Sequence, residues 1–170
     1  VAKLTLTRVR GFFTRSAGML SAAFAVFWLL KTYNFDLTPA YDGRFGMLGA
    51  IGRAAAFVFA PAGFGFWQAC VALLCGFMAK ESIVGMLAVI TGATGAALSE
   101  ELALMFTPAS ALSFLVFVLL YTPCVSTLRA MTEELKSRRR ALFYTLRQLI
   151  IAYVISVIVY QAVSLVTLRL

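Results

Sequence analysis

Apolar residues fill this chain in long runs, and short polar stretches separate the runs. A membrane-spanning helix needs about 20 predominantly apolar residues. Three runs reach that length, at residues 12–30, 106–128 and 141–168. The pattern therefore predicts three spans at these positions.

A shorter apolar run covers residues 47–60, carries Arg53 in its middle and ends at Pro61. About 14 residues are too few to cross a bilayer, so we expect a helix that lies in the membrane interface. Residues 1–15 form a basic lead-in to the membrane domain at 16–170. We expect a solvated segment there, with a helix on the membrane surface as the alternative.

The run at residues 67–90 carries a charged doublet, Lys80-Glu81, in its middle. A charge at the centre of a bilayer costs about 2.5–3.5 kcal/mol even on insertion scales, so such charges usually serve function. Neighbours on a regular helix point about 100° apart, and one of the pair would face lipid. If the backbone turns at the doublet, both can face a protein-lined cavity. This favours a re-entrant helical hairpin over one long tilted span.

The distribution of charge gives a second reason for the hairpin. Basic residues gather at 3–15 and again at 129–147, and such blocks belong on the cytoplasmic side of a membrane. A full crossing at 67–90 would place the second block outside. A hairpin that enters and returns leaves residues 91–107, with Glu100 and Glu101, outside and brings the block to the cytoplasm.

Composition agrees with a membrane location. The chain is 62% hydrophobic and 13% charged, whereas soluble domains carry about 25% charged residues. The net charge of +8 comes from blocks that flank apolar spans, and the aromatic residues lie within the spans, so we expect no nucleic-acid binding. The chain has no histidine, which excludes a His-based zinc site. It also has no P-loop motif, and we expect no enzyme activity.

A second break interrupts the run at 106–128, at Tyr121-Thr122-Pro123-Cys124. Proline has no N–H and clashes with the carbonyl four residues earlier, here that of Leu119. The carbonyls of Leu119 and Leu120 therefore need another partner, which can be a side chain, a water or an ion.

Broken helices whose ends meet in mid-membrane are a common way for transporters to bind ions. Carboxylate, thiol and carbonyl groups are all metal ligands, and together they suit a borderline divalent cation such as ferrous iron. We therefore expect Cys124 and Glu81 as metal ligands, with Lys80 either tuning the local charge or pairing with Glu81. The remaining candidate residues of the path are Tyr121, Thr122, Pro123, Leu119 and Leu120.

Each of these residues also has a simpler interpretation. A free cysteine usually behaves as a small buried hydrophobe, which is our interpretation of Cys70 and Cys75 and stays open for Cys124. Pro123 can be a plain structural kink. The doublet Lys80-Glu81 can be a satisfied pair at a helix end. An odd number of cysteines in apolar segments predicts no disulfide framework.

Two stretches carry a resemblance to a known family. FGFWQACVALLCGFMAKESIVGML at 64–87 and FTPASALSFLVFVLLYTPCVSTL at 106–128 resemble the second gate region of ferrous iron transport protein B. The resemblance implies an all-α, nucleoside-transporter-like gate repeat in a multi-pass protein of the bacterial inner membrane that moves Fe²⁺ into the cytoplasm. It places Cys124 on the iron path and makes Glu81 its companion.

The family also carries an N-terminal GTP-binding domain and a first gate repeat, and neither is in this sequence. We therefore expect the C-terminal part of a transporter. GTP would bind only to the missing domain. The expected partners are the missing N-terminal half, membrane lipid and, as a possibility, further copies of the same protein. Two alternatives remain: a gate-fold carrier for a small organic solute such as a nucleoside, and a scaffold that transports nothing.

Overall fold

The computed structural model describes residues 18, 21, 25, 26, 28–30, 32, 33, 46–78, 80, 82–121 and 124–167. The basic lead-in and most of the expected first span lie outside the described residues. So do three expected path residues: Glu81, Thr122 and Pro123. Within the first span, residues 28–30 are described and are helical.

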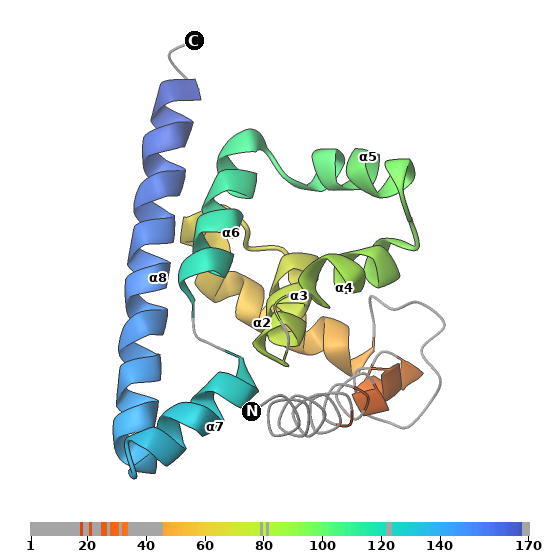
Figure 1. The fold of residues 1–170 in the computed structure, drawn as a ribbon. Helices are drawn as coiled ribbons and strands as arrows, with labels where there is room; N and C mark the ends of the chain where they lie inside the picture. The colour runs from red at the N-terminus through yellow and green to blue at the C-terminus, as the bar shows by residue number, and fades with distance from the viewer. Residues whose placement is uncertain are drawn as a thin grey trace, which may run out of the picture.

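Every element that the structure assigns in the described residues is a helix, which confirms the all-α class. In chain order these are α2 (Met47–Phe59), the short 3-10 helix η1 (Ala60–Ala62), α3 (Trp67–Met78), α4 (Ser82–Thr91), α5 (Ala96–Met105), α6 (Pro108–Leu120), α7 (Val125–Glu134) and α8 (Arg138–Thr167). Figure 1 shows α8 as the longest element, with α6 beside it and α7 leading into its lower end.

Helix α8 has the length and surface of a membrane span. Its 30 residues give a length of about 45 Å, and its outward face is apolar, as at Leu142, Ile150 and Ile158. Among the described residues it is the one helix long and apolar enough to cross by itself. Two bent pairs, at 47–77 and 82–105, would raise the number to three if each were one span. The expected positions of the spans stay a prediction.

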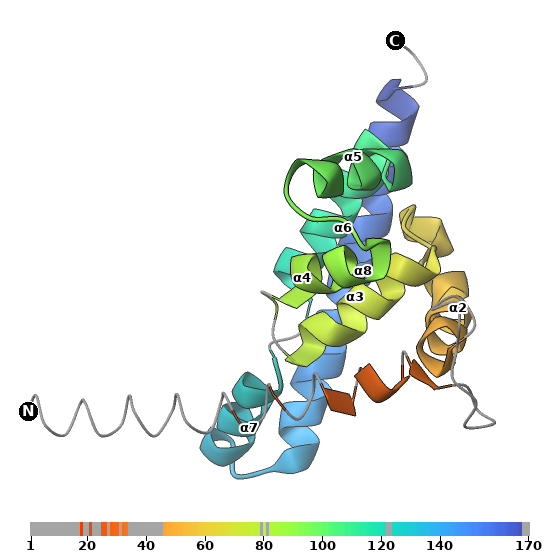
Figure 2. The same cartoon turned by 90° about the vertical axis from the view of Figure 1, so that its right-hand side faces the viewer.

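The helix is interrupted at Lys80, which lies in a turn. Helix α3 ends at Met78 and α4 begins at Ser82, so no continuous helix runs through the break. On one helix Gly76 and Ile83 would be about 10.5 Å apart along the axis. Instead a Cβ added at Gly76 would lie 2.5 Å from Ile83 Cγ1. The two helices therefore pack against each other across the break, and Figure 2 shows them from the side. The re-entrant hairpin at 67–90 stays a prediction.

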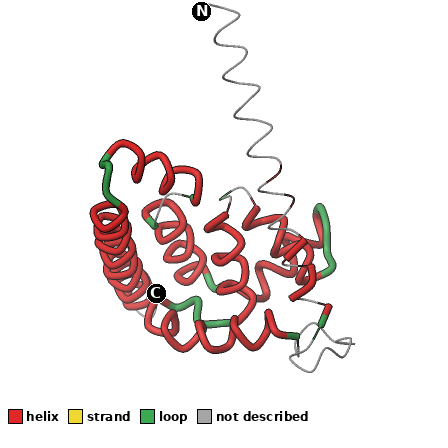
Figure 3. Tube along the Cα trace, turned by 90° about the horizontal axis from the view of Figure 1, so that it is seen from below, coloured by secondary structure: helices red, strands yellow, loops and turns green. Residues whose placement is uncertain are grey.

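Helix α5 was not expected, because the sequence predicted a loop at residues 91–107. It forms from ten residues rich in alanine, leucine and glutamate, which are strong helix formers, and it follows Gly95 in a positive-φ conformation. Helix α4 meets it at an angle of 86°. Figure 3 shows helices joined by short loops, with no strand, in the part of the chain that the structure describes.

The core joins α3, α4, α6 and α8 through buried aromatic and small residues. The ring of Phe117 contacts those of Phe59, Phe64 and Tyr121, with ring centroids 5.2–5.6 Å apart. Small residues such as Ala152, fully buried on α8, let the helices approach closely. This core fixes the lower end of α6 against α3, and that contact forms the candidate site.

Candidate functional site

The two helix breaks meet through one side chain. The ammonium of Lys80, in the turn between α3 and α4, donates to the backbone carbonyl of Val118 at 3.1 Å and to that of Tyr121 at 3.0 Å. Val118 lies in the last turn of α6, and Tyr121 is its C-cap residue. Lys80, between α3 and α4, therefore lies against Tyr121, at the end of α6.

The end of α6 suits a cation because its last carbonyls have no partner within the helix. Their dipoles place about half a negative charge at this end. The Lys80 ammonium also lies 4.8 Å from the centre of the Tyr121 ring, within the range of a cation–π contact. A third terminal carbonyl, that of Leu120, accepts from Gln148 Nε2 of α8 at 3.2 Å.

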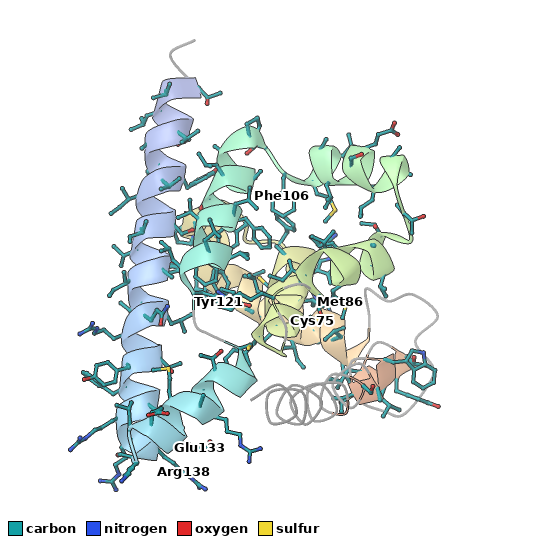
Figure 4. All side chains as sticks on the ribbon, in the orientation of Figure 1. Cys75, Met86, Phe106, Tyr121, Glu133 and Arg138 are labelled. Atoms are coloured by element: carbon teal, nitrogen blue, oxygen red, sulfur yellow. The ribbon has the colours of Figure 1, made fainter. Side chains whose placement is uncertain are left out.

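Tyr121 occupies the centre of the site. Its side chain is 4% exposed, and its ring stacks on that of Phe117. Its hydroxyl lies against Gly76 of α3, 2.7 Å from where a Cβ would stand, and has no hydrogen-bond partner among the described residues. Figure 4 labels Tyr121 and Cys75 near the middle of the molecule, where α3 passes α6.

Cys124 stands at the N-cap of α7, between the end of one helix and the start of the next. Its backbone carbonyl accepts the N–H groups of Thr127 and Leu128, and its Sγ lies 3.5 Å from Thr127 Oγ1. The thiol is partly exposed, unlike those of Cys70 and Cys75. Cys124 follows Tyr121 by three residues, and Tyr121 is the residue whose carbonyl accepts from Lys80, so the thiol belongs to the same helix break.

The expected residues divide into three groups. Lys80, Tyr121 and Cys124 come together. The side chain of Leu119 is 77% exposed, while the role expected of its backbone carbonyl stays a prediction. Cys70 and Cys75 are buried in α3, as the hydrophobic interpretation predicts. In the part of the chain that the structure describes, which omits Glu81, no three His, Cys, Asp or Glu residues gather.

Sequence reasoning missed two hydrogen bonds at the end of α6, one from Lys80 to Val118 and one from Gln148 to Leu120. The acceptor at Val118 is a backbone carbonyl, which leaves no sign in the sequence. Gln148 could have been noticed, because it is a polar amide in the apolar run of α8, and such a residue usually finds a partner inside the protein.

Comparison with known proteins agrees with this architecture. Residues 13–138 match the family described as "Gate: Nucleoside recognition". No solved structure matches the chain. The family match covers both helix breaks and the helices that frame them, from α2 to the start of α8.

Proteins named Fe(2+) transporter FeoB are similar over nearly the whole chain. The Staphylococcus aureus (strain MSSA476) protein is 34% identical over 162 residues, which cover 92% of this chain and 24% of that protein. The Methanocaldococcus jannaschii protein is 32% identical over 94% of this chain and 25% of its own length. A Porphyromonas gingivalis protein, named as a fusion of Fe(2+) transport protein A with FeoB, is 33% identical over 77% of this chain.

The chain thus spans about a quarter of the length of the first two relatives. Its apolar helices and these similarities identify a membrane protein. The chain belongs to the Gate family and corresponds to a membrane gate region of the kind found in FeoB transporters.

Proposed function

We propose that this chain forms part of the Fe²⁺ path in a longer transporter of the bacterial inner membrane. The observation that carries the proposal is the contact between the two helix breaks, through Lys80 and the carbonyls of Val118 and Tyr121. Discontinuous helices that meet in this way form ion sites in many transporters. The names of the similar proteins supply the identity of the ion.

The chemistry of the site suits ferrous iron as the transported substrate. Cys124 offers a soft sulfur and Glu81 a hard carboxylate, a combination that favours a borderline divalent ion. The end of α6 carries partial negative charge, while the start of α7 beside Cys124 carries partial positive charge. These opposed fields keep binding moderate, as an ion must also leave the site.

The rest of the transporter lies outside this chain in the proposal. A GTP-binding domain and a first gate repeat would complete it, and the site would form between the two repeats. Membrane lipid would cover the apolar face of α8. Further copies of the protein are possible partners.

The test places Cys124→Ser and Glu81→Gln separately in a full-length transporter that carries this chain. Each should lower the rate of uptake of radioactive ferrous iron at least about tenfold, because each removes a ligand. The amount of transporter in the membrane should be the same in each variant as in the wild type. Glu100→Gln, on the exposed α5, is the matched control and should transport normally. Wild-type uptake in both test variants would remove these residues from the path.

A nucleoside or similar solute is the second candidate substrate, because the matched family is described by nucleoside recognition. Fold alone does not decide substrate. Uptake of labelled iron in the presence of excess nucleoside, and of labelled nucleoside in the presence of excess iron, separates the two. We expect iron uptake that nucleosides do not inhibit.

A further inference from the structure

We propose that Lys80 determines the ion specificity of this site, because its ammonium is a tethered cation that competes with entering ions for the carbonyls at the end of α6. This inference rests on the proposed function and adds a role for a residue that is not itself a metal ligand.

The surroundings of the ammonium are those of a small cation. Two backbone carbonyls accept from it at 3.0 and 3.1 Å, and the face of the Tyr121 ring lies 4.8 Å away. Carbonyl oxygens are the groups with which proteins bind hard ions such as Na⁺ and K⁺. In this structure Lys80 takes the position that such an ion would need.

The contacts of the ammonium that the structure describes are all with dipoles: two backbone carbonyls and the Tyr121 ring. Dipoles stabilise a charge without cancelling it, so the ammonium keeps its positive charge at the helix break that carries Cys124. An ion that approaches the thiol meets this charge unless the ammonium moves away.

The structure leaves room for the ammonium to move, but the space that it would enter offers no polar side chain from the described residues to contact it. Lys80 borders a cavity of about 520 Å³ between α4, α5 and α6. The other residues that line it are apolar, such as Leu87, Phe106 and Leu115. The ammonium would lose its carbonyl contacts in this cavity, so an entering ion displaces it only if that ion gains more binding free energy at the site than the ammonium loses.

Competition of this kind selects for divalent ions with affinity for sulfur. A tethered group has a high effective concentration at its own site. A monovalent ion that gains no ligand beyond the carbonyls therefore does not displace it. A ferrous ion carries twice the charge and gains the thiol of Cys124 and the carboxylate of Glu81 as well. Lys80 would thus exclude alkali ions and admit the substrate.

The first experiment measures leakage of a monovalent ion. Lys80→Met, Lys80→Gln and Lys80→Arg are made in a full-length transporter that carries this chain and reconstituted in vesicles. Removing the charge in the Met and Gln variants should raise Rb⁺ entry about tenfold, whereas Arg should keep the wild-type value. Lys136→Met, in the exposed turn between α7 and α8, is the control for loss of a charge and should not leak.

The Gln variant separates charge from folding, because glutamine can still donate to two carbonyls without carrying a charge. If Lys80 were merely a structural tether, folded Gln and Met variants would both stay closed to Rb⁺, and the inference would be wrong. If Met does not reach the membrane, the result with Gln decides alone.

The second experiment reads the charge at Cys124 and needs no iron transport. Thiol reagents of opposite charge are compared, and the signal that Cys124→Ser removes is assigned to this residue. The anionic reagent should react faster in the wild type, and its advantage should fall about tenfold in Lys80→Gln. An unchanged ratio would contradict the inference. Failure of the wild type to take up iron would instead count against the proposed function.

Discussion

Ser113 of α6 and Ser156 of α8 form a hydrogen bond to each other between the two helices. Their hydroxyl oxygens lie 2.8 Å apart, and both side chains are fully buried. Ser156 Oγ also donates to the Ser113 carbonyl at 3.1 Å, and Ser113 Oγ lies 2.7 Å from the carbonyl of Ala62 in η1. One pair of small polar residues thus ties three elements together.

Replacing Ser113 by alanine should destabilise the fold by about 1 kcal/mol, a typical value for hydrogen bonds between membrane helices. The change leaves the carbonyl of Ala62 without its partner. Unfolding of the purified protein in mixed micelles, followed by circular dichroism, measures the loss. Ser164→Ala is the control, because Ser164 bonds only within α8 and should tolerate the change. Equal stability of the two variants would show that the pair contributes nothing.

Gly76→Ala should destabilise the hairpin of α3 and α4. The new methyl would stand 2.5 Å from Ile83 Cγ1 and 2.7 Å from the Tyr121 hydroxyl, and both of these side chains are buried. Overpacking of this kind costs about 1–3 kcal/mol. A thermal melt of the folded protein should show the loss.

Gly85→Ala supplies the matched control for that substitution. Gly85 lies on the exposed side of α4, and a Cβ there meets nothing within 4 Å. This variant should gain up to about 1 kcal/mol, since alanine favours helix over glycine. Adding Ile83→Val to Gly76→Ala should recover part of the stability, because the two side chains compete for one space. Equal melting of the two single alanine variants would show that the contact does not limit packing.

Both helix breaks could be predicted because they depend on residues with strong local effects. A charged doublet in an apolar run makes a continuous buried helix costly, and a proline removes a backbone donor. The end of α2 followed from Pro61 and Gly63 in the same way, and η1 ends at Gly63 with φ +83°.

The partners of those breaks could not be predicted. Lys80 was expected to tune the local charge or to pair with Glu81, its neighbour in sequence. Its observed acceptors are main-chain atoms 38 and 41 residues away, and any residue type would present the same carbonyl. Helix α5 was missed for a different reason: its residues are helix formers without an apolar stripe, so only propensity indicated it.

Gly63 and Gly92 separate backbone strain from steric conflict. Both have positive φ, +83° and +73°, so a Cβ strains the backbone at either position. At Gly92 nothing lies within 4 Å of an added Cβ, whereas a Cβ at Gly63 would collide with the ring of Tyr160 on α8. Gly63→Ala should therefore destabilise more than Gly92→Ala in thermal melts, by about 1–3 kcal/mol of overpacking. Similar melting temperatures would show that the Tyr160 ring moves aside freely.

The two ends of the molecule should face opposite sides of the membrane. Helix α5 lies at one end of α6, and the corner where α7 meets α8 lies at the other, as Figure 1 shows. The corner carries three consecutive arginines from Arg138 and should be cytoplasmic, while α5 carries Glu100 and Glu101 and no basic residue.

Single cysteines at Ser99 and Ser137, each in a background without native cysteines, test this orientation. A maleimide that cannot cross membranes should label Ser99→Cys in intact cells, or in spheroplasts where an outer membrane shields it. Ser137→Cys should be labelled only after the membrane is opened. Label at both positions before opening would mean that the two ends share a side. The hairpin of α3 and α4 could not then return the chain as the charge pattern requires, so the orientation deduced from the basic blocks would be wrong.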